Sequence, residues 1–287
     1  MNKQKAALLS IFSNAALIIF KVIAGILMGS VSVISEAIHS SIDLLASLIA
    51  FLSIKKASKA EDDEHPFGHG KYENVSGFVE ALLILLAAAL IVYEAIKRMF
   101  EGGIVKNVGA GIFVMLVAAA VNFFISMILL KIAKKTDSIA LEADAMHLLT
   151  DVYTSLGVFV GLVLLQITKI PIIDPITAIL VAVLIVKTSI GLIKKSLNDL
   201  VDSKLPDDDI SKILSILDSH SQITRYHSLR TRKSGPTREI DVQVHVDENT
   251  SLVDAHRLCD KIEAEIKNAF PGQSYVMIHP EPEALIK

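Results

Sequence analysis

Residues 75–93 read VSGFVEALLILLAAALIVY, an apolar run in which Glu80 is the only charged side chain. An α-helix needs about 20 predominantly apolar residues to cross the hydrocarbon core of a bilayer, so this run predicts a membrane-spanning helix. The same scan finds five further apolar runs, near residues 6–27, 31–54, 108–130, 139–167 and 172–193. The sequence therefore predicts a membrane protein built on an all-α bundle of six transmembrane helices.

The composition supports this class of protein and excludes others. Hydrophobic residues make up 52% of the 287-residue chain, more than one water-soluble core can hide, which excludes a disordered chain. A net charge of −3 leaves no basic surface that could follow a nucleic acid. The single cysteine, Cys259, cannot form an intrachain disulfide or a cysteine-rich zinc site. The first apolar run is too long for a cleaved signal peptide and contains Lys21.

Lysine and arginine residues are unevenly divided between the two sets of span ends. Cytoplasmic loops carry an excess of these residues, so the richer side is cytoplasmic and both chain termini lie there. We therefore expect a multi-pass protein of the inner (plasma) membrane, in contact with lipid. The richer side has Lys3, Lys5, Lys55, Lys56, Lys59, Lys71, Lys131, Lys134, Lys135, Lys194 and Lys195, and the poorer side has Lys97, Arg98, Lys106 and Lys169.

The chain changes character after about residue 200, which divides it into a transmembrane domain (1–200) and a cytosolic domain (201–287). In the second domain Ile240, Val242 and Val244 alternate with polar residues, the pattern of a strand with one wet face. The element order αββαβ indicates a ferredoxin-like α+β fold. The expected elements are a helix at 207–218, strands at 223–232 and 238–247, a helix at 252–269 and a strand at 274–280.

Two of the predicted spans carry the pattern H-x-x-x-D. The second span contains His39 and Asp43, and the fifth contains His147 and Asp151. Four residues make about one helical turn, so each pair lies on one face of its helix. Two such faces turned toward each other would present two imidazoles and two carboxylates, a first shell for a tetrahedral divalent cation whose charge the carboxylates balance.

A single His–Asp pair on a soluble helix is more often a hydrogen-bonded core pair than a metal site. Here the repeated spacing in two membrane spans favours a shared metal site, because ionisable groups are costly within a bilayer. Lys21, Glu80 and Asn122 are weaker candidates in the spans. Each is explained equally well as a polar contact between helices or as a residue lining water.

Three sequence motifs resemble those of a known family. They are HPFGHGKYE at 65–73, ADAMHLLTD at 143–151 and LRTRKSGPTR at 229–238. Together with the six spans they resemble the cation diffusion facilitator family, in particular its bacterial zinc and ferrous-iron exporters. The resemblance covers essentially the entire chain, with the motifs in the order and spacing of that family.

The resemblance implies a homodimer in which each protomer has its own transport site, formed by His39, Asp43, His147 and Asp151. It implies a second metal site in the loop after the second span, formed by Asp62, His65 and His69. It implies a third site in the cytosolic domain, which would bind metal and support dimerisation, and it matches Lys71 and Asp202 to a charge pair between the domains. The residues matching this third site are His227, His256, His279 and Glu281.

Two positions depart from the family's pattern in the third site. Gln243 stands where the family has a histidine, and His245 follows two residues later on the same strand face. The acidic position after His279 is Glu281 in place of an aspartate. His245 is therefore a further candidate ligand, and the number of ions held there stays open.

These features predict efflux of a divalent metal cation in exchange for protons, and no enzymatic activity. Two imidazoles with two carboxylates suit Zn²⁺, whereas Mn²⁺ and Mg²⁺ prefer more oxygen ligands. Fe²⁺, Cd²⁺ and Co²⁺ stay open, as does a transporter of the same family for Fe²⁺, Cd²⁺ or Mn²⁺. Two other classes are a membrane receptor that senses metal, which needs an output surface, and an intramembrane hydrolase, which needs an open coordination position.

Overall fold

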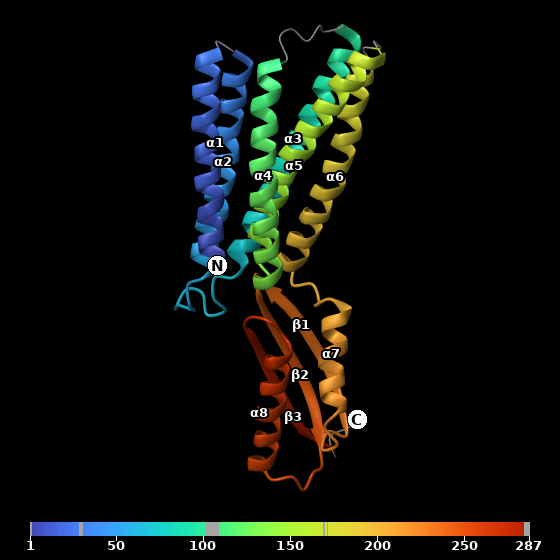
Figure 1. Ribbon diagram of the computed structural model, residues 1–287. Coiled ribbons are helices and arrows are strands. Elements are labelled where there is room, and N and C mark those ends of the chain that lie inside the picture. The colour runs from blue at the N-terminus through green and yellow to red at the C-terminus, as the bar shows by residue number, and fades with distance from the viewer. Residues whose placement is uncertain (1, 29–30, 102–108, 169, 171, 284–287) are drawn as a thin grey trace.

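The computed structural model describes residues 2–28, 31–101, 109–168, 170 and 172–283 (Figure 1). Within these residues the first 200 positions form six long helices, as the sequence predicts. The helices are α1 (Lys3–Met28), α2 (Val31–Ala57), α3 (Lys71–Glu101), α4 (Gly109–Thr136), α5 (Ile139–Thr168) and α6 (Ile173–Leu200).

Four of these helices are long and apolar enough by themselves to cross a membrane, namely α1, α3, α4 and α6. The other two, α2 and α5, are of similar length and carry the His and Asp residues of the predicted transport site. The helices extend beyond the predicted apolar runs. For example, α3 begins at Lys71, because its polar first turn continues the helix beyond the apolar stretch.

Small and hydroxyl-bearing residues allow the helices to approach closely. Ala81 and Ala88 of α3 pack with Ile185 and Leu192 of α6, and the Ser189 hydroxyl donates a hydrogen bond to the Ala81 carbonyl over 2.6 Å. A second apolar cluster joins α1, α2, α4 and α5. Association of helices in lipid relies on such close packing and on hydrogen bonds between helices, since lipid itself is apolar.

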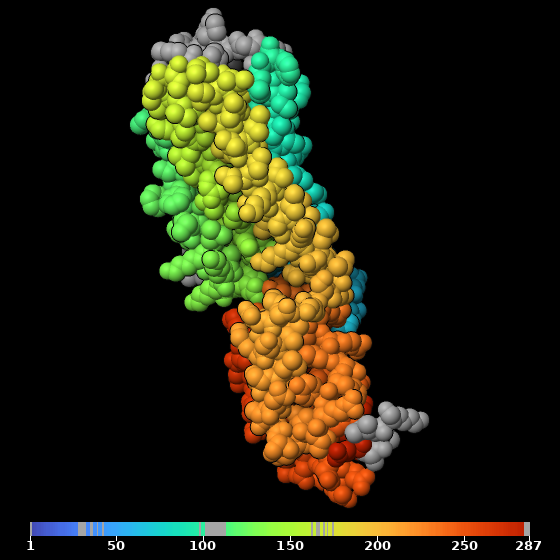
Figure 2. All heavy atoms as spheres, turned by 90° about the vertical axis from the view of Figure 1, so that its right-hand side faces the viewer, coloured from blue at the N-terminus to red at the C-terminus, as the bar shows by residue number. Residues whose placement is uncertain are grey.

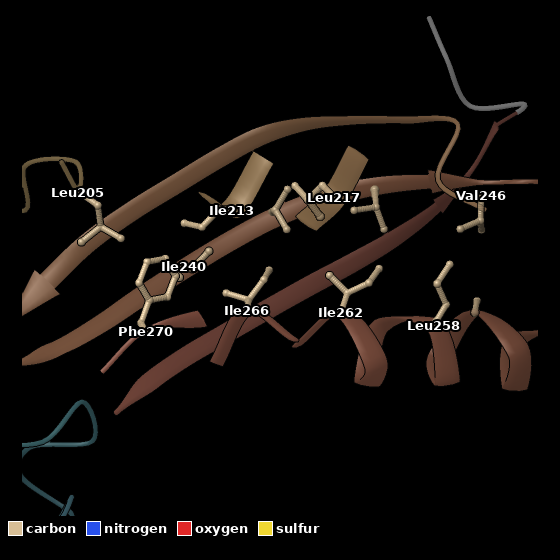
Figure 3. Packing of buried hydrophobic residues seen from close by; sticks show 12 residues of the cluster. Leu205, Ile213, Leu217, Ile240, Val246, Leu258, Ile262, Ile266 and Phe270 are labelled. Atoms are coloured by element: carbon tan, nitrogen blue, oxygen red, sulfur yellow. The ribbon is translucent and has the colours of Figure 1, made fainter. Parts of the chain in front are cut away.

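The C-terminal domain has the predicted order αββαβ. Strands β1 and β2 are antiparallel and β2 and β3 are parallel, in the sheet order β1-β2-β3. Helices α7 and α8 cover one face of the sheet, and Figure 3 shows their apolar side chains directed at those of β2. The elements are α7 (Asp207–Asp218), β1 (Arg225–Ser234), β2 (Thr237–Val246), α8 (Leu252–Ala269) and β3 (Ser274–Pro282).

The C-terminal domain packs end to end on the bundle (Figure 2). The turn between β1 and β2 lies at this contact. The Gly235 amide donates a buried hydrogen bond of 2.8 Å to Asn74 Oδ1 of α3. Gly235 has a φ of +59°, and a Cβ added to it or to Gly70 would collide with the other chain segment's backbone. We call Gly70, Asn74, Ser234 and Gly235 the hairpin joint.

Ion pairs surround the hairpin joint. Lys71 Nζ lies 2.8 Å from Asp202 Oδ1, so the predicted pair between these two residues is confirmed. The hydrogen bond and the charge of Lys71 hold the pKa of the Asp202 carboxyl below its ordinary value. Asp137, between α4 and α5, pairs with Lys233 at 2.7 Å and with Arg238 at 3.1 Å. These contacts fix the sheet domain against the bundle ends at which α3 begins and α4 and α6 end.

Candidate metal centres

The bundle brings three of the four predicted transport-site residues together. Asp43 Oδ1 on α2 lies 3.0 Å from His147 Nε2 on α5, and Asp151 lies one turn further along α5. Each of the three offers a ligand atom within 4.8 Å of the others. Asp43 and His147 are buried and Asp151 is half-buried. His39 lies one turn before Asp43 on α2, and its side chain is outside the described part of the structure.

Asn122 of α4 completes the surroundings of this site. Its amide donates a hydrogen bond of 3.3 Å to Asp151 Oδ2, so this weaker candidate is a polar contact to a predicted ligand. Lys21 of α1 donates to the Ser40 hydroxyl over 2.7 Å and lies on the wall of the adjoining cavity. The first contact places an amide against Asp151, and the second holds an ammonium group at the wall of the adjoining cavity.

A cavity of about 430 Å³ adjoins the site. Asp43, Asp151 and Asn122 line one end, and Glu94 of α3 and Pro175 of α6 line its wall further away. Because α3 begins and α6 ends at the C-terminal domain, Glu94 and Pro175 lie toward the opposite side of the bundle. The cavity therefore leads from the predicted metal ligands away from the C-terminal domain.

The other side of the site is filled by a buried polar network that the sequence analysis did not weigh. Ser47 of α2 donates a 2.8 Å hydrogen bond to Asp144 Oδ1 of α5 and accepts one of 2.8 Å from Asn14 of α1. The signal was available, because Asp144 is a charged residue within a predicted span. Asp144 lies outside the repeated H-x-x-x-D pattern, so that pattern does not mark it.

The loop between α2 and α3 brings its three predicted ligands together. His65 Nδ1 lies 3.1 Å from Asp62 Oδ1, and His69 Nε2 lies 3.2 Å from Asp62 Oδ2. The His69 Nδ1 faces the Ala60 carbonyl at 3.2 Å and can donate a hydrogen bond to it, an arrangement that leaves Nε2, on the side of Asp62, as the nitrogen available to a metal ion. These residues form a group with the composition of a metal site.

The carboxylate of this loop group is held in its ionised form. Desolvation acts to raise the pKa of Asp62, but hydrogen bonds from the backbone and ring of His65 outweigh it and keep the pKa below its ordinary value. The backbone amide of His65 donates to Asp62 Oδ1 over 2.7 Å. An ionised carboxylate beside two imidazoles is an arrangement that attracts a cation.

In the C-terminal domain, His227, His245 and Glu281 form a third group on the sheet face opposite α7 and α8. Glu281 Oε2 lies 3.5 Å from His227 Nε2 and 3.7 Å from His245 Nε2. The strand register explains the group. His245 of β2 pairs with Glu281 of β3, and His227 of β1 pairs with Gln243, which lies two residues before His245 on the same face of β2. A one-residue bulge in β1 follows His227, and its Ser228 has a φ of +53°.

The structure places three candidate ligands of this domain differently from the sequence prediction. His245 was expected on a wet sheet face, but it is buried because the His227 ring, 4.9 Å away, and Glu281 cover it. His279 is exposed and reaches only the other Glu281 oxygen, at 3.7 Å. His256 lies on α8, behind the sheet, where it pairs with Asp260 at 3.6 Å, so the described protomer does not bring it to the group.

A six-helix membrane bundle with a carboxylate and imidazole group beside an internal cavity defines a membrane transporter of metal cations. The chain belongs to the cation efflux family. Residues 7–201 match the cation efflux transmembrane domain, and residues 205–283 match the cytoplasmic domain of cation efflux proteins, a dimer-forming domain. The protein is therefore a multi-pass membrane transporter and not an enzyme.

Two relatives match along nearly the whole chain, and a solved structure matches part of it. An uncharacterized transporter, sll1263 of Synechocystis sp., is 35% identical over 277 residues, covering 96% of this chain and 89% of the relative. The cation-efflux pump FieF of Salmonella agona is 29% identical over 282 residues, covering 98% and 93%. A solved structure of a putative zinc transporter, CzrB in its zinc form, is 34% identical and covers 30% of this chain and 98% of its own, with a TM-score of 0.28.

Proposed function

We propose that this transporter exports Zn²⁺ from the cytoplasm in exchange for protons, using His39, Asp43, His147 and Asp151 as the transport site. The observation that carries the proposal is the convergence of ligand atoms from Asp43, His147 and Asp151 within 4.8 Å of one another, inside the bundle. Two carboxylates balance the charge of a divalent ion, which lowers the cost of holding that ion away from water.

The nature of the ligands favours zinc and explains coupling to protons. Imidazole nitrogen with carboxylate oxygen in tetrahedral geometry suits Zn²⁺, while Fe²⁺, Co²⁺ and Cd²⁺ are the ions most able to compete. A metal ion binds imidazole and carboxylate only in their deprotonated forms. Protons and metal therefore exclude each other at His147, and a proton gradient directed inward drives metal outward when the site faces each side in turn.

The charge distribution supports the orientation. Lysines cluster at the ends of the bundle near the C-terminal domain, as Lys55 and Lys56 of α2 and Lys134 and Lys135 of α4 illustrate. By the positive-inside rule these ends, the C-terminal domain and both termini lie in the cytoplasm of a cell bounded by the inner (plasma) membrane. The cavity beside Asp43 and Asp151 then leads outward, so the described conformation is one that releases metal and takes up protons.

The other two groups are proposed as bound-metal sites that do not transport. Asp62, His65 and His69 form a zinc site in the loop, and His227, His245 and Glu281 form one in the cytosolic domain, with His279 next to it. The match to a dimer-forming cytoplasmic domain supports a homodimer. His256 would take part only through a rearrangement or a second protomer, since in this protomer it lies on the other side of the sheet.

Zinc uptake into proteoliposomes with an imposed pH difference tests the proposal. Wild-type protein should accumulate zinc against its gradient, whereas Asp43→Asn and Asp151→Asn should each abolish accumulation because one charge of the site is lost. Glu142→Gln is the matched control, since this carboxylate lies on α5 but pairs with Lys195 away from the site. Flux at the wild-type level in either aspartate variant contradicts the assignment, and a metal receptor would accumulate no zinc at all.

A further inference from the structure

Two carboxyl groups outside the metal groups are completely buried within the bundle. Glu80 of α3 and Asp144 of α5 each have 0% of their surface exposed. Both lie in membrane-embedded helices, where a charged side chain without a counter-ion is costly. Neither belongs to any of the three groups that bring potential metal ligands together, and neither lines the cavity beside Asp43.

The hydrogen-bond partners of this pair supply no positive charge. Asp144 Oδ1 accepts from Ser47 over 2.8 Å, and Glu80 Oε1 accepts from Ser76 over 3.3 Å. The second oxygen of each carboxyl, Glu80 Oε2 and Asp144 Oδ2, is buried with no hydrogen-bond partner. Among the residues that the structure describes, no lysine or arginine forms an ion pair with either carboxyl.

The charged and titratable neighbours differ for the two carboxyls. The charged group that acts electrostatically on Glu80 is Asp144, a like charge. Beside Asp144, the group that can carry a positive charge is the imidazole of His147 on the same helix, which attracts the carboxylate without forming an ion pair with it, and α1 and α2 contribute the neutral side chains of Ser10 and Ser47. Lys3 pairs with Glu73, which lies two turns before Glu80 on α3 and also accepts a hydrogen bond from the Ser138 hydroxyl. The positive charge of Lys3 is therefore paired with Glu73 and not with Glu80 or Asp144.

The position of the pair sets it apart from the outward cavity. Asp144 comes three residues before His147 on α5, which starts next to the C-terminal domain, so it lies about one turn toward that domain. Glu80 likewise lies in the half of α3 that begins at the hairpin joint. Both carboxyls are thus on the side of the transport site that is closed in the described conformation.

We propose that Glu80 and Asp144 are proton-binding sites separate from the metal site, and that both are protonated in this conformation. A buried carboxylate with no counter-ion is stabilised by taking up a proton, because the neutral acid is far cheaper to keep out of water. A metal ion is the less suitable occupant, since the pair brings no imidazole and its neighbours are serine hydroxyls. Wetting of this side would allow both acids to release their protons.

Infrared spectroscopy of the full-length protein in lipid, treated with a chelator and measured at neutral pH, tests the proposal without requiring transport. Wild-type protein should show carbonyl-stretching absorption of protonated carboxylic acids that shifts in D₂O. Glu80→Gln and Asp144→Asn should each remove one such component. Glu142→Gln, which changes an exposed ion-paired carboxylate on α5, should remove none.

Isotope labelling keeps the test decisive if a variant fails to fold. In wild-type protein, ¹³C at the glutamate side-chain carboxyl should shift one component to lower frequency, and ¹³C at that of aspartate should shift another. Absence of protonated-acid absorption in the wild type at neutral pH would overturn the proposal. So would a spectrum that is unchanged in both the Glu80 and Asp144 variants. Neither result bears on zinc transport, so the two proposals fail independently.

Discussion

Replacement of Gly70 by alanine should loosen the contact between the cytosolic domain and the bundle. A Cβ at this position would lie much closer than 3.0 Å to the Ser234 carbonyl oxygen. This oxygen belongs to the backbone, so it cannot rotate away. The turn must therefore retreat, and the 2.8 Å hydrogen bond from the Gly235 amide to Asn74 is lost. Leaving such buried groups unpaired costs about 1–3 kcal/mol.

Hydrogen exchange measured by mass spectrometry on the peptide that contains the β1–β2 turn reports this loss directly. About 1.4 kcal/mol corresponds to a tenfold change in an equilibrium constant, so Gly70→Ala should speed exchange in the turn by roughly one to two powers of ten. Asn74→Ala should act in the same direction, because it removes the acceptor. The Gly70 backbone is not in the left-handed region, so the effect comes from the contact and not from strain in the residue itself.

Gly68→Ala is the matched control two residues earlier. Gly68 has a φ of +76°, so alanine there costs about 1–2 kcal/mol of backbone strain, but its Cβ would meet only the Glu61 side chain at 3.9 Å. This variant should lower the melting temperature and leave exchange in the turn unchanged. If the turn exchanges at the wild-type rate in the Gly70→Ala variant, the close backbone approach does not hold the two domains together.

Three more outcomes are expected. His245→Ala should reduce the number of zinc ions that calorimetry finds on the full-length protein, whereas His256→Ala should not, and the reverse result would place the cytosolic site elsewhere. His39→Asp replaces a nitrogen ligand by a charged oxygen, so competition in proteoliposomes should show Cd²⁺ or Fe²⁺ gaining on Zn²⁺, and an unchanged preference would remove His39 from the site. Because the pKa of Asp202 is lowered by Lys71, the stabilisation from this pair is complete above about pH 4 and falls away as the pH drops through the lowered value. The difference in melting temperature between wild type and Asp202→Asn should follow that course, and a difference that grows on acidification would contradict it.

The secondary structure was predictable because its signals are local. The start of α7 after Pro206 and the alternation along β2 placed the C-terminal elements within about two residues. The face that a helix turns toward a sheet is a tertiary property, and for that reason sequence reasoning could not see that His256 lies behind the ligand-bearing face. Burial of His245 depends in the same way on how a bulged neighbouring strand places His227 over it.

The grouping of the proposed transport-site residues was predictable to a greater extent, since one helical turn relates the two candidate ligands within each span. The four-residue spacing predicts that His147 and Asp151 share one helix face. The approach of α2 to α5, which brings Asp43 to His147, depends on the packing of the bundle and could not be predicted from spacing. Asp144 was missed because nothing in a repeated motif marks it. Its importance comes from complete burial, which is a property of the packed helices.

The loop ligands and the hairpin joint are neighbours in the covalent chain. His69, whose ring faces Asp62, is joined by one peptide bond to Gly70, whose backbone lies against Ser234. An ion that fixes His69 therefore also restricts the segment on which the cytosolic domain rests. Thermodynamic reciprocity then relates the two processes, since whatever factor docking adds to metal affinity in the loop, metal must add to docking. If the proposed loop site binds metal, the concentration of free metal would thus set how firmly the two halves of the transporter move as one body.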